Sequence, residues 1–150
     1  MNKEAEDIAE KRRRRPPLAL MRSGVAVIGD TQFLPGYSLL LREPRVGRLE
    51  DLPLSGREVF LKEMAMLGEA VQIACSPRRV NYSIYGNTDA FLHAHVFPRY
   101  DWEPLERVVR PVWTYPEENW SNPLMEYDEQ NHGALREQIS AELKRLMQPA

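Results

Sequence analysis

Apolar residues in the middle of the chain recur at helical spacing. Between Phe60 and Ala74 they stand three or four residues apart, so they share one face of a helix that packs on a core. Ser55 and Glu58 have the spacing of an S-x-x-E capping box, which predicts that this helix begins at Ser55. Pro77 is expected to end it. The apolar stripe consists of Phe60, Met64, Leu67, Val71 and Ala74.

A second stripe of the same kind lies near the C-terminus. Its spacing predicts a helix from about Gly133 to Met147. The residues on its apolar face are Leu135, Ile139, Leu143 and Leu146.

Segments with the patterns of strands flank the first helix. Two short stretches rich in aliphatic residues precede it, Val25–Ile28 and Tyr37–Leu41, and turn signals adjoin both. Two alternating segments follow it, 80–85 and 91–97. The turn-prone segment 86–89 joins these two, so they are predicted to form a hairpin.

The segment between the hairpin and the last helix has a different composition. From Trp102 to Pro123 it is rich in aromatic residues and proline, which predicts an ordered, extended wrap rather than a helix or a strand. We expect its aromatic residues to pack over the sheet or across a dimer contact, with stacking on a nucleotide base as the alternative. These aromatic residues are Trp102, Trp113, Tyr115 and Trp120.

Composition limits the class of protein. A chain of 150 residues with 43% hydrophobic and 28% charged residues is typical of one globular domain. No stretch approaches the roughly 20 apolar residues that span a bilayer, and the N-terminus lacks the pattern of a secretory signal, so we expect a cytoplasmic protein without membrane contact. The net charge is only -2, but beyond the basic run from Lys11 to Arg15 the chain has no matching basic stripe, and from Tyr100 onward the charge balance turns acidic. A nucleic-acid ligand is therefore not expected, except at that basic run.

The second strand of the hairpin carries two histidines on one face. One residue lies between His93 and His95, so their rings project in the same direction, separated by about 6.6 Å at roughly 3.3 Å of rise per residue. Such a pair can offer two nitrogens to a zinc or iron ion, but the sequence shows no further ligand at a recognised spacing. One histidine can instead act as a general acid or base. An imidazole can also attack phosphorus while its neighbour holds the phosphate oxygens.

Two segments of the sequence carry a family resemblance. Residues 86–100 read GNTDAFLHAHVFPRY, and residues 30–40 read DTQFLPGYSLL. The first resembles the signature of the histidine triad (HIT) family of nucleotide hydrolases and transferases, in which histidine and apolar residues alternate three times. The second is similar to that family's segment leading into a core strand. The likeness covers about residues 24–100 and favours attack on phosphorus among the three chemistries.

The resemblance implies a fold and a division of the chain. The fold is α+β, with a HIT-like antiparallel sheet of about five strands, a packed central helix and a C-terminal helix, usually paired into a homodimer. Residues 1–17 are expected to be a flexible basic arm and 18–105 the catalytic domain. Residues 106–150 would add the aromatic wrap and the last helix to the same domain. No cofactor and no metal are expected.

The resemblance also implies a reaction. The family cleaves phosphoanhydrides or phosphoramidates at the α-phosphorus of a nucleotide, so the expected activity is hydrolysis of a diadenosine polyphosphate or a related nucleotide, or nucleotidyl transfer. His93 matches the middle histidine, which takes the nucleotidyl group before water releases it. His95 matches the last histidine, which contacts the phosphate. A neutral imidazole suits this attack because anionic phosphate oxygens repel negative nucleophiles.

Four further residues are predicted to bind substrate. Asn87 and Thr88 occupy the loop that in relatives contacts phosphate or the leaving group, and Asp30 lies near the family's ribose-binding position. Arg99 follows the histidine strand and is expected to balance phosphate charge.

The sequence departs from the family pattern at two positions. Phe91 stands where the first histidine of the triad normally lies, and Tyr37 occupies a position that some relatives fill with a further histidine. The loss of the first histidine supports a second hypothesis, a nucleotide-binding or regulatory protein without catalysis. A metal-binding protein that uses His93 and His95 is the third.

Overall fold

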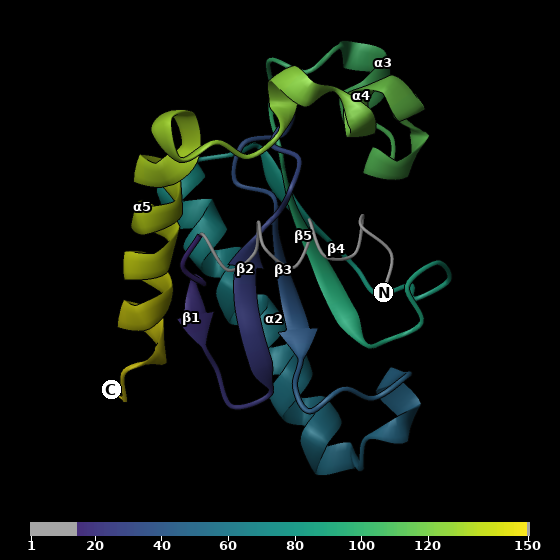
Figure 1. Ribbon diagram of the computed structural model, residues 1–150, viewed down its shortest axis with the longest axis vertical. Coiled ribbons are helices and arrows are strands. Elements are labelled where there is room, and N and C mark those ends of the chain that lie inside the picture. Colours follow the sequence, from purple (N-terminus) through teal and green to yellow (C-terminus); the bar gives the residue numbers. More distant parts are fainter. Residues whose placement is uncertain (1–14, 150) are drawn as a thin grey trace.

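The computed structural model describes residues 15–149, which form one antiparallel sheet with helices on it. The sheet has five strands in the order β1-β2-β3-β5-β4, so the expected α+β fold is confirmed (Figure 1). The predicted strands lie within one or two residues of the observed ones, and only β1 has no counterpart among the predictions. The strands are β1 (Ala19–Leu20), β2 (Gly24–Ile28), β3 (Ser38–Arg42), β4 (Arg79–Ser83) and β5 (His93–Arg99).

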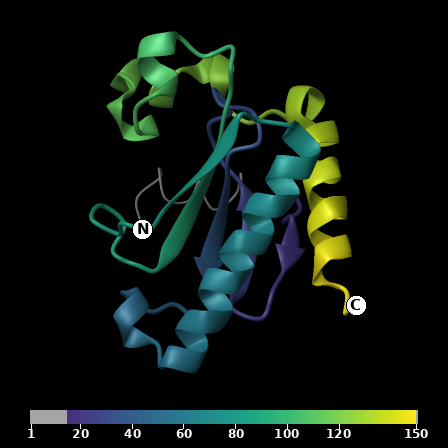
Figure 2. The ribbon, with the colours of Figure 1, turned by 180° about the vertical axis from the view of Figure 1, so that it is seen from behind.

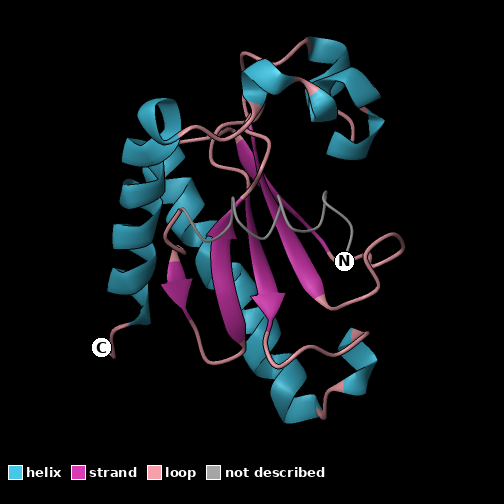
Figure 3. Ribbon diagram, viewed as in Figure 1, coloured by secondary structure: helices cyan, strands magenta, loops and turns pink. Residues whose placement is uncertain are grey.

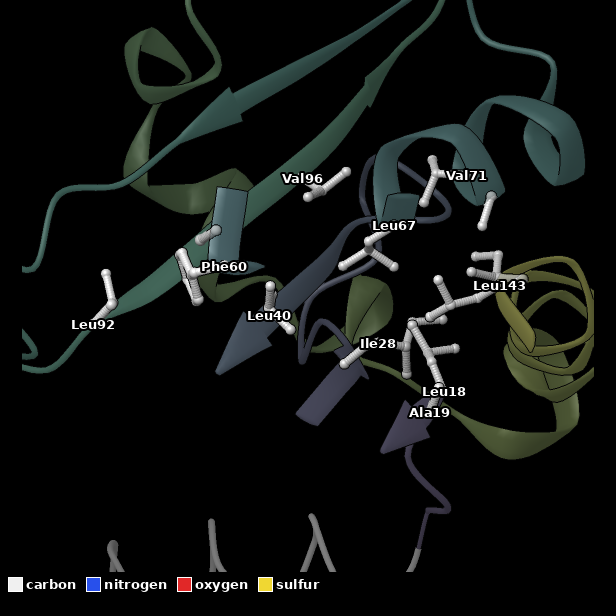
Figure 4. Packing of buried hydrophobic residues seen from close by; sticks show 14 of the residues in the cluster. Leu18, Ala19, Ile28, Leu40, Phe60, Leu67, Val71, Leu92, Val96 and Leu143 are labelled. Atoms are coloured by element: carbon white, nitrogen blue, oxygen red, sulfur yellow. The ribbon is translucent and has the colours of Figure 1, made fainter. Parts of the chain in front are cut away.

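Two long helices cover one face of the sheet. Helix α2 (Leu54–Cys75) crosses the strands, and α5 (Glu129–Met147) lies beside it, as Figure 2 shows from behind. Both predicted apolar stripes face this layer, where their central residues are fully buried. Figure 4 shows the resulting core between the helices and the sheet. No helix within residues 15–149 is long and apolar enough to cross a membrane.

The first turn of α2 differs from the prediction. The N-cap is Pro53, with an extended ψ of 161°, and Ser55 lies inside the helix, where it cannot act as the cap. The N–H groups of Gly56 and Arg57 donate to the carbonyl of Pro53, so the proline backbone starts the helix and no side chain caps it. The predicted end is confirmed, because Ser76 adopts a left-handed conformation directly before Pro77.

Helix α5 begins at Glu129, one turn before the predicted Gly133. The carboxylate of Asp128 accepts hydrogen bonds from the N–H groups of Gln130 and Asn131, and this N-cap fixes the start of the helix. The first turn is polar, so apolar periodicity could not reveal it.

The hairpin of β4 and β5 is confirmed, and its register positions the histidines. In β5, Ala94 and Val96 are fully buried against α2, so His93 and His95 point to the opposite face. Strand β5 pairs with β3 on one side and with β4 on the other, while β4 is an edge strand.

The aromatic segment after β5 is helical rather than extended. Figure 3 shows a cap of short helical turns at one end of the sheet. Pro104, Pro111 and Pro116 each stand directly before the first residue of a turn. Proline is favourable there because its φ is preset and an N–H at this point would lack a helical partner. The turns are α3 (Leu105–Val108), η2 (Val112–Thr114), α4 (Glu117–Ser121) and η3 (Pro123–Met125).

This cap packs on the sheet, as the sequence analysis predicts for its aromatic residues. Val112 is buried in a second apolar cluster with Phe33 and Phe97, and Trp120 packs against it. The ring of Trp120 makes edge contacts with Phe33 at 4.9 Å and with Phe97 at 5.7 Å between ring centroids. The predicted basic arm lies outside the described residues, except for its last three positions, 15–17.

A buried carboxylate joins α2 to the β1–β2 turn. Glu63 is 6% exposed, and its two oxygens accept hydrogen bonds from the backbone N–H groups of Arg22 at 3.1 Å and Ser23 at 2.6 Å. A charged acceptor makes these bonds stronger than neutral ones, and removing it leaves the N–H of the buried Ser23 without this partner, together with that of Arg22.

We therefore expect Glu63→Ala to lower the free energy of unfolding by about 2 to 3 kcal/mol in urea denaturation. The matched control is Glu58→Ala on the same helix, which should change it by less than about 0.5 kcal/mol because Glu58 is exposed. A larger loss of unfolding free energy for Glu58→Ala than for Glu63→Ala would contradict both the stabilising role of the Glu63 hydrogen bonds and the absence of a capping box formed by Ser55 and Glu58.

Candidate active site

His93 and His95 lie where two cavities meet on the sheet face opposite α2. The first cavity, of about 540 Å³, is formed mainly by the loop after β4. The second, of about 230 Å³, is formed by β2, β3 and the segment that follows β2. Both include the two histidines and Trp113. A larger cavity of about 630 Å³ runs along β4 but contains neither histidine, so cavity size alone does not identify the candidate active site.

The backbone fixes the tautomer of the neutral His93 ring. Its Nδ1 lies 2.7 Å from the carbonyl oxygen of Phe91. A carbonyl oxygen can only accept, so Nδ1 carries the hydrogen and the lone pair of the neutral ring is on Nε2. The side chain is 6% exposed, and the ring of Phe91 packs against it at 4.7 Å between centroids. His93 is therefore held as the tautomer in which Nε2 is a nucleophile or a base.

His95 is held by Tyr37. Its Nδ1 is hydrogen-bonded to the Tyr37 hydroxyl at 2.7 Å, and its ring meets that of His93 edge-on at 4.8 Å between centroids. The pKa of His95 is lowered to about 4, mainly by burial and also by the neighbouring His93, while Asp89 opposes the shift. His95 is therefore neutral at neutral pH. The ring of Trp113 packs against the His95 ring, at 4.9 Å between ring centroids.

The structure brings five of the six predicted site residues together. Asn87 and Thr88 line the first cavity with both histidines, and Asp30 lines the second with the same pair. Asp30 is held in place by its own backbone, because its carbonyl accepts a hydrogen bond from Tyr127 N–H at 2.7 Å. More than fifty residues of chain separate Asp30 from the loop after β4, and the pairing of β3 with β5 brings the two together.

The sixth residue, Arg99, has a different role from the predicted one. Its side chain is 3% exposed, and the guanidinium forms an ion pair with Glu103 at 3.0 Å. It also donates to the side chain of Asn81 and to the carbonyls of Arg107 and Arg110. Neither histidine cavity includes it. Arg99 therefore ties the cap of short helices to β4 and β5, and its charge is not directed to the site.

Several residues that line the two cavities were not predicted as site residues. Tyr85 and Asp89 adjoin the predicted loop, so their proximity to it was the available signal. Trp113 belongs to the segment predicted to wrap the sheet, but the pattern could not show that one of its aromatic residues faces the histidines. Arg15 ends the basic run, which offered no sign of contact with the site.

The described residues contain no group of three or more histidine, cysteine, aspartate or glutamate side chains that could hold a metal ion. The arrangement they do form is a pair of histidine rings between two cavities, one lined by an amide, a hydroxyl and a carboxylate and the other by aliphatic side chains and two carboxylates.

Comparison with known structures identifies the fold. A histidine triad protein from Marinobacter aquaeolei VT8 superposes with a TM-score of 0.70 at 21% identity, covering 87% of this chain and 90% of that one. A histidine triad protein from Bradyrhizobium japonicum gives 0.65 at 16% identity, covering 93% and 96%. A hypothetical histidine triad nucleotide-binding protein from Sulfolobus tokodaii gives 0.66 at 12% identity, covering 92% and 91%.

This chain has the histidine triad fold. No protein-family model and no curated protein sequence matches it, so the likeness is one of structure. Phe91 lies two residues before His93, just ahead of the start of β5. Its backbone carbonyl accepts the hydrogen bond that orients the His93 ring. The ring of Phe91 in turn lies under the guanidinium of Arg45, at 4.3 Å from its centroid.

The depressed pKa of His95 predicts a pH dependence of stability. Between about pH 6.5 and pH 4 the unfolded chain binds a proton at His95 and the folded one does not, so the free energy of unfolding falls as the pH is lowered through this range. Urea denaturation at pH 7 and pH 5 measures the difference.

In His95→Gln the fall between pH 7 and pH 5 should be smaller than in the wild type. His132→Gln is the comparison variant, since His132 lies on α5 outside both cavities, and the fall should be smaller in His95→Gln than in His132→Gln. An equal fall in wild type and His95→Gln would show that His95 is not held neutral by its surroundings.

Proposed function

We propose that this protein is a histidine triad nucleotide hydrolase that cleaves a nucleoside phosphoanhydride at the α-phosphorus. The observation that carries the proposal is the hydrogen bond between His93 Nδ1 and the carbonyl of Phe91, which leaves the lone pair on Nε2. The nucleotide-binding description of the Sulfolobus tokodaii neighbour supports the class of substrate. A diadenosine polyphosphate, whose two nucleosides require room on both sides of the nucleophile, is the substrate that we favour.

In the proposed first step, His93 Nε2 attacks the α-phosphorus. A nitrogen–phosphorus bond forms, the bond from phosphorus to the bridging oxygen breaks, and its electron pair leaves with the phosphate of the departing group. The Nδ1 proton stays with His93, where the Phe91 carbonyl stabilises the positive charge that the ring acquires. Water then attacks the same phosphorus and releases a proton to solvent, the nitrogen–phosphorus bond breaks, and its electron pair returns to Nε2.

His95 is proposed to stabilise the phosphate oxygens during both steps. If its Nδ1 accepts from the Tyr37 hydroxyl, its Nε2 carries the hydrogen and is a donor toward the cavity. This donor is neutral, consistent with its depressed pKa, and it has a fixed direction because Tyr37 holds the other nitrogen. Preorganised donors of this type stabilise charge that develops in a transition state.

The two cavities suit the two parts of the substrate. The second cavity has aliphatic walls, including Leu39 and Leu41, and a carboxylate at Asp30, which fit a base and the hydroxyls of a ribose. The first cavity, with Asn87 and Thr88, is proposed to hold the departing phosphate and the group attached to it. Homodimer formation and a cytoplasmic location also remain predictions, and the free edge of β4 is where a second copy would pair.

We expect His93→Ala to lower the rate of nucleotide polyphosphate hydrolysis by roughly 10³-fold or more, because the other imidazole in the cavities, His95, is proposed to carry hydrogen on Nε2 and cannot attack with that nitrogen. Nucleotide binding, measured by calorimetry, should persist within about a few fold. Wild-type protein mixed with an α-³²P-labelled nucleotide and quenched should carry acid-labile label on His93 alone. Unchanged turnover in His93→Ala, or label on another residue, would refute the nucleophile.

Phe91 favours a second candidate function, nucleotide binding without turnover. In this chain the side chain at the first triad position is a phenyl ring packed on His93, so it cannot donate or accept a hydrogen bond during catalysis. A protein of that kind would bind nucleotides in calorimetry but release no product over a long incubation. Multiple turnovers by the wild type would exclude it.

A further inference from the structure

A nucleotide bound at this site brings several negative charges to cavities that already contain carboxylates. Asp30 lines one cavity, and Asp89 lines both. His95 adds no positive charge at neutral pH, and the guanidinium of Arg99 is committed to Glu103. The phosphate chain therefore needs a cation from elsewhere in the protein.

Arg15 is the lysine or arginine that the structure places in this position. Among the described residues it is the only one of either type that lines a histidine cavity. Its side chain is 10% exposed and forms an ion pair with Asp30, and its guanidinium lies 4.9 Å from the centroid of the Tyr127 ring. Aromatic contact and an ion pair together hold the guanidinium at the rim of the cavity.

The chain that follows Arg15 is firmly anchored. Leu18 is fully buried, its N–H donates to the carbonyl of Ala26, and its own carbonyl accepts from the hydroxyl of Ser140 on α5. Only Pro16 and Pro17 separate Arg15 from this anchor, and each has a restricted φ. The backbone of Arg15 is thus attached by a short, stiff connection to the core of the fold.

We propose that Arg15 is a specificity-determining residue that binds the phosphate chain of the nucleotide and thereby selects polyphosphates. The inference rests on the proposed function and extends it to a residue outside the resemblance. A guanidinium has five N–H donors in one plane, so it can keep a bond to Asp30 while others reach two phosphate oxygens. In this arrangement Asp30 orients Arg15 and also accepts from the ribose hydroxyls.

Binding measurements on the full chain test this with three probes of increasing charge, namely adenosine, AMP and α,β-methylene-ATP. In Arg15→Gln the Kd for α,β-methylene-ATP should rise about tenfold or more, and that for AMP by less, because each charge-assisted bond contributes about one power of ten. The Kd for adenosine, which has no phosphate, should stay within about twofold of the wild type. Arg15→Lys should recover part of the affinity for the polyphosphate.

Two further arginine variants serve as controls. Arg145→Gln removes the same charge from α5, where Arg145 pairs with Glu142, and it should bind all three probes as the wild type does. Arg45→Gln removes the cation that lies over Phe91, outside both cavities, and should also have little effect. A loss of polyphosphate affinity in Arg45→Gln but not in Arg15→Gln would assign the role to Arg45 and overturn the proposal.

The other outcomes separate this inference from the proposed function. If the wild type binds the nucleotides and Arg15→Gln binds them equally well, the inference is wrong while the function stands. If Arg15→Gln binds adenosine and α,β-methylene-ATP more tightly, Arg15 is a plug on Asp30 rather than a ligand for phosphate, which also overturns the inference. If the wild type binds none of the nucleotides, the proposed function fails and the inference fails with it.

Discussion

The chemistry of this site depends on one hydrogen bond from a histidine ring to the main chain. Because the carbonyl of Phe91 accepts from His93 Nδ1, the ring has one tautomer and one orientation, and its other nitrogen is left for chemistry. The sheet supplies the rest. Pairing of β5 with β3 and β4 fixes the strand on which both histidines stand, and the burial of Ala94 and Val96 against α2 forces the histidines to the other face.

That dependence on the main chain changes the meaning of the phenylalanine at the first triad position. A substitution there alters the side chain but leaves the carbonyl, so the contact that orients His93 survives it. The phenyl ring offers no polar group beside His93. Instead it is an apolar surface that packs on His93 and on the guanidinium of Arg45. The attack proposed for His93 would therefore keep its geometry beside an apolar neighbour.

Sequence patterns predicted most of what short-range periodicity controls. The stripe from Phe60 to Ala74 and the alternation around His93 place the helix, the hairpin and the histidine face correctly, because burial on one side of an element sets its period. Helix starts were less predictable. At Pro53 the backbone of a proline begins the helix although Ser55 and Glu58 have the spacing of a capping box, and at Asp128 the cap precedes a polar turn that shows no apolar signal.

The errors in the site concern two arginines whose partners are set by the tertiary fold. Arg99 directly follows the strand that carries the histidines, whereas Arg15 ends a basic run much earlier in the chain, so sequence position favoured Arg99. The guanidinium of Arg99 forms an ion pair with Glu103 and donates hydrogen bonds to carbonyls of the helical cap, which packs on the sheet. Arg15 comes to the cavity because Leu18 is anchored between β2 and α5. Charge at an active site is thus decided by which partners the tertiary fold brings to each guanidinium, and sequence spacing does not contain that information.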